Sequence, residues 1–246
     1  MDISIIIPAY NEEKNIVPIC EEVIESLDKM DVIYEIVLVD DGSSDNTFDA
    51  MSVAKNTYDN IEIVKFNKNY KKSAAYMAGI KKSCGDIVVT IDADLQDDPS
   101  EIKKMVSLIG EYDVVVGWKE NRVDSVTKVV PSRLFNWINK KLFGISLKDN
   151  DSGFRVMTKE AANKLDLYGD LYRFIPALLA NKGYSITEVS VNHRSRNSGK
   201  SKYGYSRFLT GLLDILTMKL ILDFNNRPSH LFGYLAFGMI AIGVIS

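Results

Sequence analysis

The strongest constraint in this sequence is the alternation of short valine- and isoleucine-rich runs with segments of helical periodicity. Because the runs are continuously apolar, they are predicted to be strands buried on both faces. They cover residues 4–8, 35–42, 61–66, 86–95 and 113–118. Helical spacing is predicted over 11–30, 48–58 and 73–83 and again from Pro99, and Ser44 or Asp45 can cap the second of these helices. Beyond residue 119, helices are predicted over 133–143 and 170–182, a short strand over 154–157 and an alternating strand over 184–193. Strands that alternate with helices predict an α/β fold, with a mostly parallel sheet covered by helices on both faces.

Polar and acidic residues follow three of the predicted strands. They are Pro8 to Glu12, Asp40 to Ser43, and Asp92 to Asp94. In sheets of this kind ligands bind beyond the carboxyl ends of the strands. The sequence therefore gathers its polar chemistry at one edge of the sheet.

Composition and motif searches exclude several classes of site. Lys and Arg number 30 against 33 Asp and Glu, so the net charge of −3 argues against wholesale nucleic-acid binding. Two cysteines and two histidines do not support a thiol-ligated zinc site, and we interpret His193 as structural rather than catalytic. Neither a GxGxxG loop nor a P-loop is present, so two common phosphate anchors are missing.

Asp92 and Asp94 form the most informative pair. In an extended chain the side chains at positions i and i+2 share a face, and two carboxylates there repel each other unless a cation lies between them. Mg²⁺ binds through one or two carboxylates together with substrate phosphates. Gln96 and Asp97 follow and could add contacts. The alternative to metal binding is that these acids stabilise the dipole of the helix that begins near Pro99, but that role suits Asp97 and Asp98 better than Asp92 and Asp94.

An ordered set of motifs resembles a known family. The motifs are PAYNEE (8–13), VDDGSSD (39–45), the segment 69–79, DADLQDDP (92–99), SGFR (152–155) and RNSGKSK (196–202). Together they are similar to the family 2 glycosyltransferases, and most similar to the branch that charges polyprenyl phosphates such as dolichyl and undecaprenyl phosphate. The resemblance covers about residues 3–230.

This resemblance implies a GT-A fold, a UDP- or GDP-sugar donor and a divalent cation, Mg²⁺ or Mn²⁺. It implies nucleotide contacts by Pro8, Tyr10, Glu12, Asp40 or Asp41, Lys72 and Asp92, and binding of the metal–diphosphate by Asp92 and Asp94 with Gln96 as third ligand. Taken singly, Pro8 could instead end a strand, Glu12 could face a helix dipole, and Asp40 and Asp41 could form a turn. One departure stands out, because the family often has glycine where this chain has Lys71.

The implied reaction is an inverting transfer of a hexose to a lipid monophosphate. Such a phosphate has a second pKa near 6, so it is largely dianionic at neutral pH and attacks without a general base. Arginine suits an anionic acceptor because it meets phosphate with two hydrogen bonds. The candidate acceptor contacts are Arg122, Arg133, Arg155, Arg196, Ser201 and Lys202. Asp149 or Asp151 is expected to touch the sugar or acceptor, with a slight preference for Asp149.

The C-terminal part of the chain favours a membrane location. We predict a catalytic domain over 1–206, an amphipathic helix over 207–228 and, over 229–246, an uncharged segment that begins a transmembrane helix. Basic residues between 194 and 207 precede that segment and predict a catalytic domain on the cytoplasmic side of the cell membrane.

Two rival hypotheses remain open at this point. The first is a family 2 transferase that acts on a sugar hydroxyl, which would need Asp149 or Asp151 as a base. The second is a non-catalytic nucleotide-sugar binder or membrane scaffold. The sequence leaves the sugar, the nucleotide, the lipid length and the oligomeric state open.

Overall fold

The computed structural model describes residues 2–119, 147–149 and 151–194, and shorter stretches at 213–215, 217–222, 232–233, 236–237, 239–240 and 243. Contacts divide the chain into two units, Met1–Lys202 and Tyr203–Ser246. The described residues of the second unit are helical. The first unit contains the sheet and all predicted nucleotide contacts.

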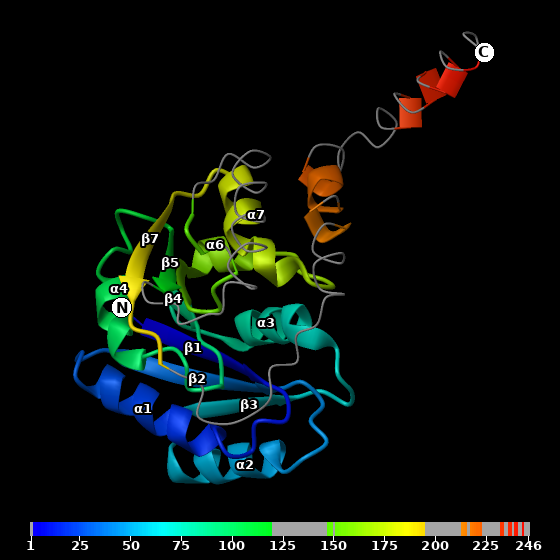
Figure 1. The fold of residues 1–246 in the computed structure, drawn as a ribbon. Coiled ribbons are helices and arrows are strands. Elements are labelled where there is room, and N and C mark those ends of the chain that lie inside the picture. The colour runs from blue at the N-terminus through cyan, green and yellow to red at the C-terminus, as the bar shows by residue number, and fades with distance from the viewer. Residues whose placement is uncertain are drawn as a thin grey trace. The chain divides into compact units, whose positions relative to one another are not determined.

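One seven-stranded sheet forms the centre of the first unit (Figure 1). Its order is β3-β2-β1-β4-β6-β5-β7. The strands are β1 (Asp2–Ala9), β2 (Ile33–Asp40), β3 (Ile61–Lys65), β4 (Ile87–Thr90), β5 (Val114–Lys119), β6 (Arg155–Thr158) and β7 (Ile186–Val191). Only β6 runs antiparallel to its neighbours β4 and β5, so the prediction of a mostly parallel sheet is confirmed.

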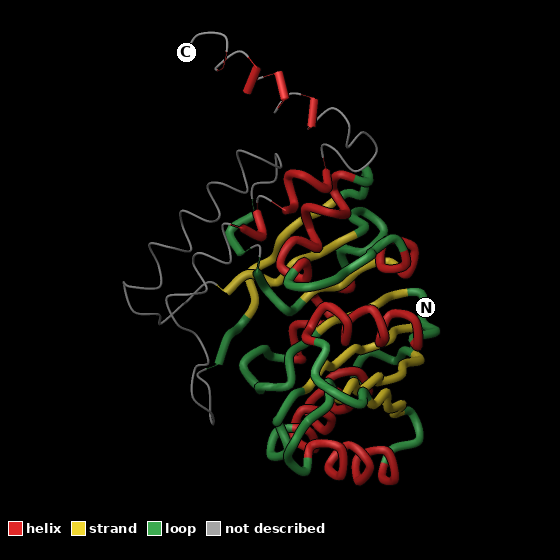
Figure 2. Tube along the Cα trace, turned by 90° about the vertical axis from the view of Figure 1, so that its right-hand side faces the viewer, coloured by secondary structure: helices red, strands yellow, loops and turns green. Residues whose placement is uncertain are grey.

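Helices cover both faces of the sheet (Figure 2). They are α1 (Ile16–Asp28), α2 (Thr47–Thr57), α3 (Lys71–Lys82), α4 (Ile102–Val106), α6 (Lys159–Asn163) and α7 (Ile175–Asn181), with 3₁₀ turns η1 (Pro99–Glu101) and η2 (Leu171–Phe174). α1 contacts α2, η1 and α4, whereas α3 contacts β1, β2, η2 and α6. The two sets of helices form the two outer layers.

Alternation along β1 explains how both layers attach to the sheet. Ile3, Ile5 and Ile7 are buried in the core that α1 and α4 complete. Ile6 is equally buried, and its side chain occupies the space in which a Cβ at Gly79 of α3 would lie. Because successive strand residues point to opposite faces, one strand supplies apolar side chains to both layers.

The strand register brings the polar strand ends together. Ala9 at the end of β1 lies opposite Asp40 at the end of β2, and the N–H of Asp41 donates to the carbonyl oxygen of Ala9 at 2.9 Å. On the other side of β1, Ile6 pairs with Thr90, and β4 ends there. The predicted single polar edge is thus confirmed for the residues that follow β1, β2 and β4.

Most predicted elements match the structure, with two corrections. The fourth strand ends at Thr90 rather than at 95, because the chain turns over Ala93 and Asp94. The strand predicted over 154–157 is β6, and its antiparallel direction was not predicted.

Two further predictions concern regions that the structure describes little or not at all. The helix expected over 133–143, and most of the segments 207–228 and 229–246, lie outside the described residues. Among the residues that are described, no helix combines the length and apolar character needed to cross a membrane.

Candidate active site

Asp92 lies at the centre of the polar edge and is paired with Lys72. The Lys72 Nζ is 2.6 Å from Asp92 Oδ1 and 2.8 Å from Oδ2, so the ammonium contacts both carboxylate oxygens. Lys72 comes from the first turn of α3, and Asp92 follows β4 by two residues. The side chains are 26% and 31% exposed, so solvent still reaches the pair from one side.

Further cations and two tyrosines surround this pair. The hydroxyl of Tyr76 lies 3.5 Å from Asp92 Oδ1, and the rings of Tyr76 and Tyr172 lie 5.5 and 5.3 Å from the Lys72 ammonium. Burial acts to raise the pKa of Asp92, but the positive charges of Lys72, Lys119 and Arg155 outweigh it and lower that pKa. Asp92 is therefore a carboxylate at neutral pH.

The charge on Lys72 is stabilised by the same pairing. Burial opposes it, yet the Asp92 carboxylate prevails and raises the Lys72 pKa well above its usual value. Burial also raises the pKa of Tyr76 to about 12, so this hydroxyl stays protonated and acts as a donor. The cluster offers a fixed ammonium beside an ionised carboxylate, which suits recognition of a diphosphate.

Because Gly153 has no side chain, the Asp92 carboxylate can occupy the space beside its Cα. A Cβ at position 153 would lie 2.6 Å from Asp92 Oδ2 and 2.7 Å from Oδ1, closer than atoms can approach. Gly153 is held there because its carbonyl oxygen accepts a 2.7 Å hydrogen bond from Thr90 Oγ1. The glycine of the SGFR motif is therefore explained by close approach to the site.

Asp94 and Gln96 lie in the turn after Asp92. Leu95 adopts φ +61° between them, and the Gln96 N–H points at Asp94 Oδ1 at 3.3 Å. Because the strand ends at Thr90, the argument that placed Asp92 and Asp94 on one face of an extended strand is wrong. Asp92 pairs with Lys72, whereas Asp94 accepts the Gln96 N–H within the turn.

The oxygen donors here fit a hard divalent cation. Within the described ranges, no three or more His, Cys, Asp or Glu side chains are grouped so as to hold a metal ion by themselves. Mg²⁺ and similar ions need only one or two carboxylates when substrate phosphates supply the remaining ligands. Asp94, with Gln96 beside it, provides such a set, so the chain's residues are compatible with a cation that is completed by a diphosphate.

The loops after β1 and β2 are joined by side chains. Asn11, at φ +57°, accepts the N–H of Ser44 at 2.8 Å, and its own N–H donates to Ser43 Oγ at 3.0 Å. Asp45, one of the two residues predicted to cap this helix, accepts the N–H of Thr47, the first residue of α2, at 3.0 Å, although the N-cap position itself is Asn46. These bonds fix the shape of the edge on which the nucleotide contacts were predicted.

Asp40 and Asp41 have different surroundings. Asp41 accepts the N–H of Tyr70 at 2.7 Å, and burial raises its pKa. Asp40 Oδ1 accepts the N–H of Ser43 at 2.9 Å, while its buried Oδ2 has no hydrogen-bond partner among the described residues. Of these two buried carboxylates, Asp40 is thus the one with an oxygen that the described residues leave without a hydrogen bond. The sequence left these two residues as alternatives.

The other predicted nucleotide contacts border the same edge. Tyr10 is 37% exposed, Pro8 is half-buried, and Glu12 accepts a 2.6 Å hydrogen bond from Asn15 Nδ2. The structure thus brings Pro8, Tyr10, Glu12 and Asp40 to the edge that also carries Asp92.

Lys71 has the backbone conformation of a glycine. Its φ is +72°, in the left-handed region that L residues other than glycine, asparagine and aspartate seldom adopt. It directly follows Tyr70, whose N–H is bound by Asp41, and precedes Lys72. The glycine expected here from the family pattern is thus explained by backbone geometry.

The family assignment follows from comparison with known proteins. Residues 4–166 match the sequence pattern described as "Glycosyl transferase family 2". The chain belongs to glycosyl transferase family 2. This span contains Asp92, Asp94 and Lys72 and the loops after β1 and β2, so the candidate site of this family 2 glycosyltransferase lies within it.

Two curated relatives resemble the transferase over nearly its whole length. A protein of Rhizobium johnstonii named dodecaprenyl-phosphate galacturonate synthase is 34% identical over 251 residues, which is 100% of this chain and 74% of that protein. An undecaprenyl-phosphate 4-deoxy-4-formamido-L-arabinose transferase of Pseudomonas syringae is 34% identical over 245 residues, covering 99% and 71%.

Solved structures show the same fold. Mannosyl-3-phosphoglycerate synthase from Rubrobacter xylanophilus aligns with a TM-score of 0.68 at 18% identity, covering 89% of this chain and 74% of that one. Glucosyl-3-phosphoglycerate synthase from Mycobacterium tuberculosis, in complex with Mn²⁺, UDP and product, aligns with a TM-score of 0.66 at 19% identity, covering 90% and 79%. The fold of the transferase is GT-A-like, with a mixed sheet.

The predicted acceptor residues are only partly described. Arg122, Arg133, Arg196, Ser201 and Lys202 lie outside the described residues. Arg155 is fully buried, and its three guanidinium nitrogens have no hydrogen-bond partner among the described residues. A direct contact with an acceptor needs an accessible guanidinium, so in this conformation Arg155 acts on the site through its charge beneath Asp92.

Asp149 and Asp151 also differ from each other. Asp149 is 5% exposed, whereas the Asp151 side chain is 39% exposed and lies 3.8 Å from the Nε of buried Arg173. Sequence reasoning missed Arg173. Its signal was an arginine within an otherwise apolar helical segment, where a charge seldom lies unless it has a partner.

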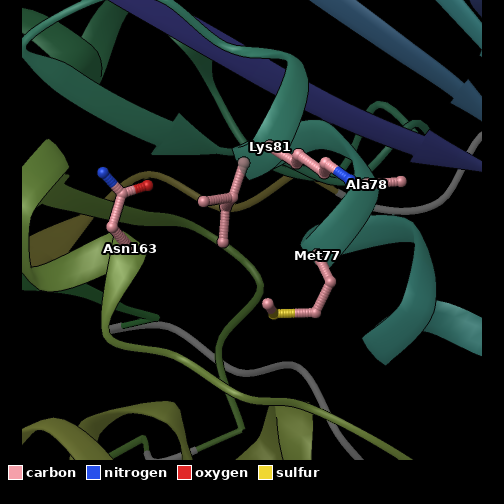
Figure 3. Close-up of a pocket in the computed structure, with 5 residues that line it drawn as sticks. Met77, Ala78, Lys81 and Asn163 are labelled. Atoms are coloured by element: carbon pink, nitrogen blue, oxygen red, sulfur yellow. The ribbon is translucent and has the colours of Figure 1, made fainter.

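An open hollow of about 380 Å³ lies apart from these residues, between α3 and α6 (Figure 3). It is lined by Met77, Ala78, Ile80, Lys81 and Asn163. None of these is a predicted site residue, and Lys72 and Tyr76 of the same helix belong to the polar edge instead. The hollow therefore does not contribute to the candidate active site.

Proposed function

We propose that this family 2 glycosyltransferase moves a hexose from a UDP- or GDP-sugar to a polyprenyl monophosphate, with inversion at the sugar carbon. The observation that carries the proposal is the Lys72–Asp92 pair at the end of β4 with Asp94 following it. The names of the relatives, which specify dodecaprenyl and undecaprenyl phosphate, support the acceptor class.

Donor binding is assigned to the edge formed by the first two loops and α3. Asp40 supplies an oxygen for the base or ribose, Tyr10 lines the opening, and Lys72 meets the diphosphate. Three observations support this assignment. Asp40 Oδ2 has no hydrogen-bond partner among the described residues, Tyr10 is exposed, and Lys72 lies at the start of α3. The N-terminal end of a helix also favours a negative ligand.

Asp94, with Gln96, would hold a divalent cation together with the donor diphosphate. Bound there, Mg²⁺ or Mn²⁺ would stabilise the charge that develops on the leaving diphosphate. Asp92 stays paired with Lys72 and fixes the direction of the ammonium. The chemistry of the oxygen donors supports this division, and the Mn²⁺ complex of a structural neighbour is consistent with it.

The acceptor phosphate would be bound by cations of the basic segments 119–148 and 194–207. As a dianion it needs no base, and the arginines and lysines of those segments would offset its charge. We place the reaction at the cytoplasmic face of the cell membrane because the same basic residues suit anionic headgroups and an uncharged segment follows them.

The decisive experiment incubates the purified full chain with labelled UDP- and GDP-sugars, Mg²⁺ or Mn²⁺, and undecaprenyl phosphate. We expect label in the lipid extract with one of the donors. Asp94→Asn should reduce transfer at least about a hundredfold, the loss typical of removing a major electrostatic contact. Asp166→Asn is the matched control, because Asp166 is an exposed carboxylate that is not among the predicted site residues.

Three outcomes separate the hypotheses. Label that appears only on a glycan hydroxyl acceptor, with loss of transfer in Asp149→Asn or Asp151→Asn, would favour the polysaccharide alternative. Binding of a nucleotide sugar without turnover on any acceptor would favour a scaffold. Full activity of Asp94→Asn would refute the proposed metal role.

A further inference from the structure

The side-chain amide of Gln96 is held at its nitrogen by two acceptors. Gln96 Nε2 lies 3.5 Å from the carbonyl oxygen of Arg194 and 3.3 Å from Nε2 of His193. The main chain joins the same two segments, because the Arg194 N–H donates to the Gln96 carbonyl oxygen at 2.8 Å and Asp97 forms an antiparallel bridge with His193. Gln96 is thus anchored by both main chain and side chain.

These contacts determine the state of the imidazole. A carbonyl oxygen can only accept, so the Arg194 contact places the amide nitrogen, not the amide oxygen, on this side. An amide nitrogen can only donate, so His193 Nε2 must accept from it. A neutral imidazole has one donor and one acceptor, and the hydrogen therefore lies on Nδ1.

A buried carboxylate faces that hydrogen. His193 Nδ1 lies 3.7 Å from Oδ1 of Asp97, whose side chain is 2% exposed. Among the described residues neither atom has a hydrogen-bond partner within ordinary reach, so Asp97 acts on Nδ1 through its charge rather than through a formed hydrogen bond. Lys119 Nζ lies 3.5 Å from the same Oδ1 and compensates the charge of Asp97. A carboxylate beside Nδ1 favours the tautomer that the Gln96 contact requires.

We infer that His193 is a positioning residue for Gln96. The Asp97–His193–Gln96 chain keeps the amide nitrogen bound on the Arg194 side and presents Oε1, the atom of the amide that can ligate a cation, on the other. Loss of the imidazole acceptor leaves the amide nitrogen with only the 3.5 Å contact to the Arg194 carbonyl oxygen, so the amide is held less firmly and can rotate to present its nitrogen, which is not a ligand. The inference rests on the proposed function, since it takes Gln96 as a ligand, and it gives His193 more than a structural role.

The first test measures the tautomer and needs no metal or substrate. The chain has two histidines, His193 and His230, so two-bond ¹H–¹⁵N correlation spectra of the labelled full chain contain two imidazoles. A His230→Gln variant assigns the remaining signals to His193. We expect a neutral ring protonated on Nδ1. A ring protonated on Nε2 would overturn the inference, because it could not accept from Gln96.

The second test measures Mn²⁺ binding by titration in the presence of UDP and, separately, GDP. His193→Leu removes the acceptor but keeps an apolar body, and it should weaken Mn²⁺ binding about tenfold, as loss of a ligand's supporting partner does. His193→Gln offers an oxygen near the position of Nε2 and should retain binding close to that of the unmodified chain. Gln96→Ala should match His193→Leu, and the double variant should be no weaker than either single one.

The outcomes distinguish this inference from the proposed function. Unchanged Mn²⁺ binding in His193→Leu, or losses that add in the double variant, would overturn the positioning role. Unchanged binding in Gln96→Ala would do the same while leaving lipid transfer and the Asp94→Asn loss intact. Unchanged binding in Asp94→Asn would instead contradict the proposed metal site. If His193→Leu does not fold, the tautomer and the His193→Gln variant still decide.

Discussion

Replacing Lys71 by glycine should stabilise the transferase. Lys71 adopts φ +72°, a conformation that costs an L residue about 1–2 kcal/mol and costs glycine nothing. Glycine in turn loses about 0.5–1 kcal/mol through the greater freedom of its unfolded chain. The net expectation is a gain of about 0.5–1 kcal/mol, which corresponds to a rise in Tm of about 1–4 °C for a domain of this size.

Two matched variants isolate the backbone as the cause. Lys71→Ala removes the same exposed side chain but keeps the Cβ, so its Tm should stay within about 1 °C of the starting value. Ala74→Gly, inside the same helix α3, should lose about 1 kcal/mol because the helix there has ordinary geometry. Thermal unfolding followed by circular dichroism measures all three. If Lys71→Ala gained as much as Lys71→Gly, the gain would come from removing the charge, and the strain argument would be refuted.

Three further predictions concern Asp92 and its surroundings. Gly153→Ala should push the carboxylate away from Lys72, because its Cβ would meet the Asp92 carboxylate, and should lower kcat/KM at least about tenfold with a loss of stability no larger than that expected for Lys72→Met. An unchanged kcat/KM would mean that the backbone yields instead. Arg155→Met removes a fully buried cation that has no hydrogen-bond partner among the described residues, so it should raise the free energy of unfolding by about 1 kcal/mol or more in urea titrations while lowering activity. A destabilised variant would show that the guanidinium is paired. Because the pKa of Asp92 is lowered in the folded state, its pairing stabilises the protein above the unfolded pKa of about 3.9, and this stabilisation is lost as the pH falls through the folded pKa. Lys72→Met should therefore cost about 1–2 kcal/mol at neutral pH, a value reduced by the partial exposure of both side chains, and the cost should shrink in acid. A cost independent of pH would exclude the pairing as its source.

The sequence predicted the layered fold because strand burial and helix periodicity are local patterns. Each strand from β1 to β5 and the helices α1 to α3 were expected within a few residues. The reversal of β6 was not, since strand direction depends on how the chain returns between β5 and β6, and a short apolar run has no direction of its own. The family pattern identified Gly153 and the Lys71 position, but only the coordinates gave the physical reason for each.

The candidate site shows where reasoning from sequence ends. The spacing of Asp92 and Asp94 was treated as extended, which requires the strand to continue past them, and β4 stops at Thr90. The contacts of Lys72 with Asp92 and of His193 with Gln96 join residues 20 and 97 positions apart. Such pairings are set by tertiary packing and leave no periodic signal, so Lys72 could be predicted as a nucleotide contact and His193 as structural, but neither could be connected to its partner.

The resulting division of labour between Asp92 and Asp94 follows from charge. A carboxylate that already faces Lys72, with Lys119 and Arg155 also lowering its pKa, has little need of a cation and would gain little by binding one. Asp94 is two residues further along, past the end of the strand, where the turn at Leu95 directs the chain toward Gln96. If both carboxylates bound the cation equally, Asp92→Asn and Asp94→Asn would weaken Mn²⁺ binding alike. We expect Asp94→Asn to weaken Mn²⁺ binding more, and Asp92→Asn to act chiefly on Lys72 and hence on binding of the nucleoside diphosphate.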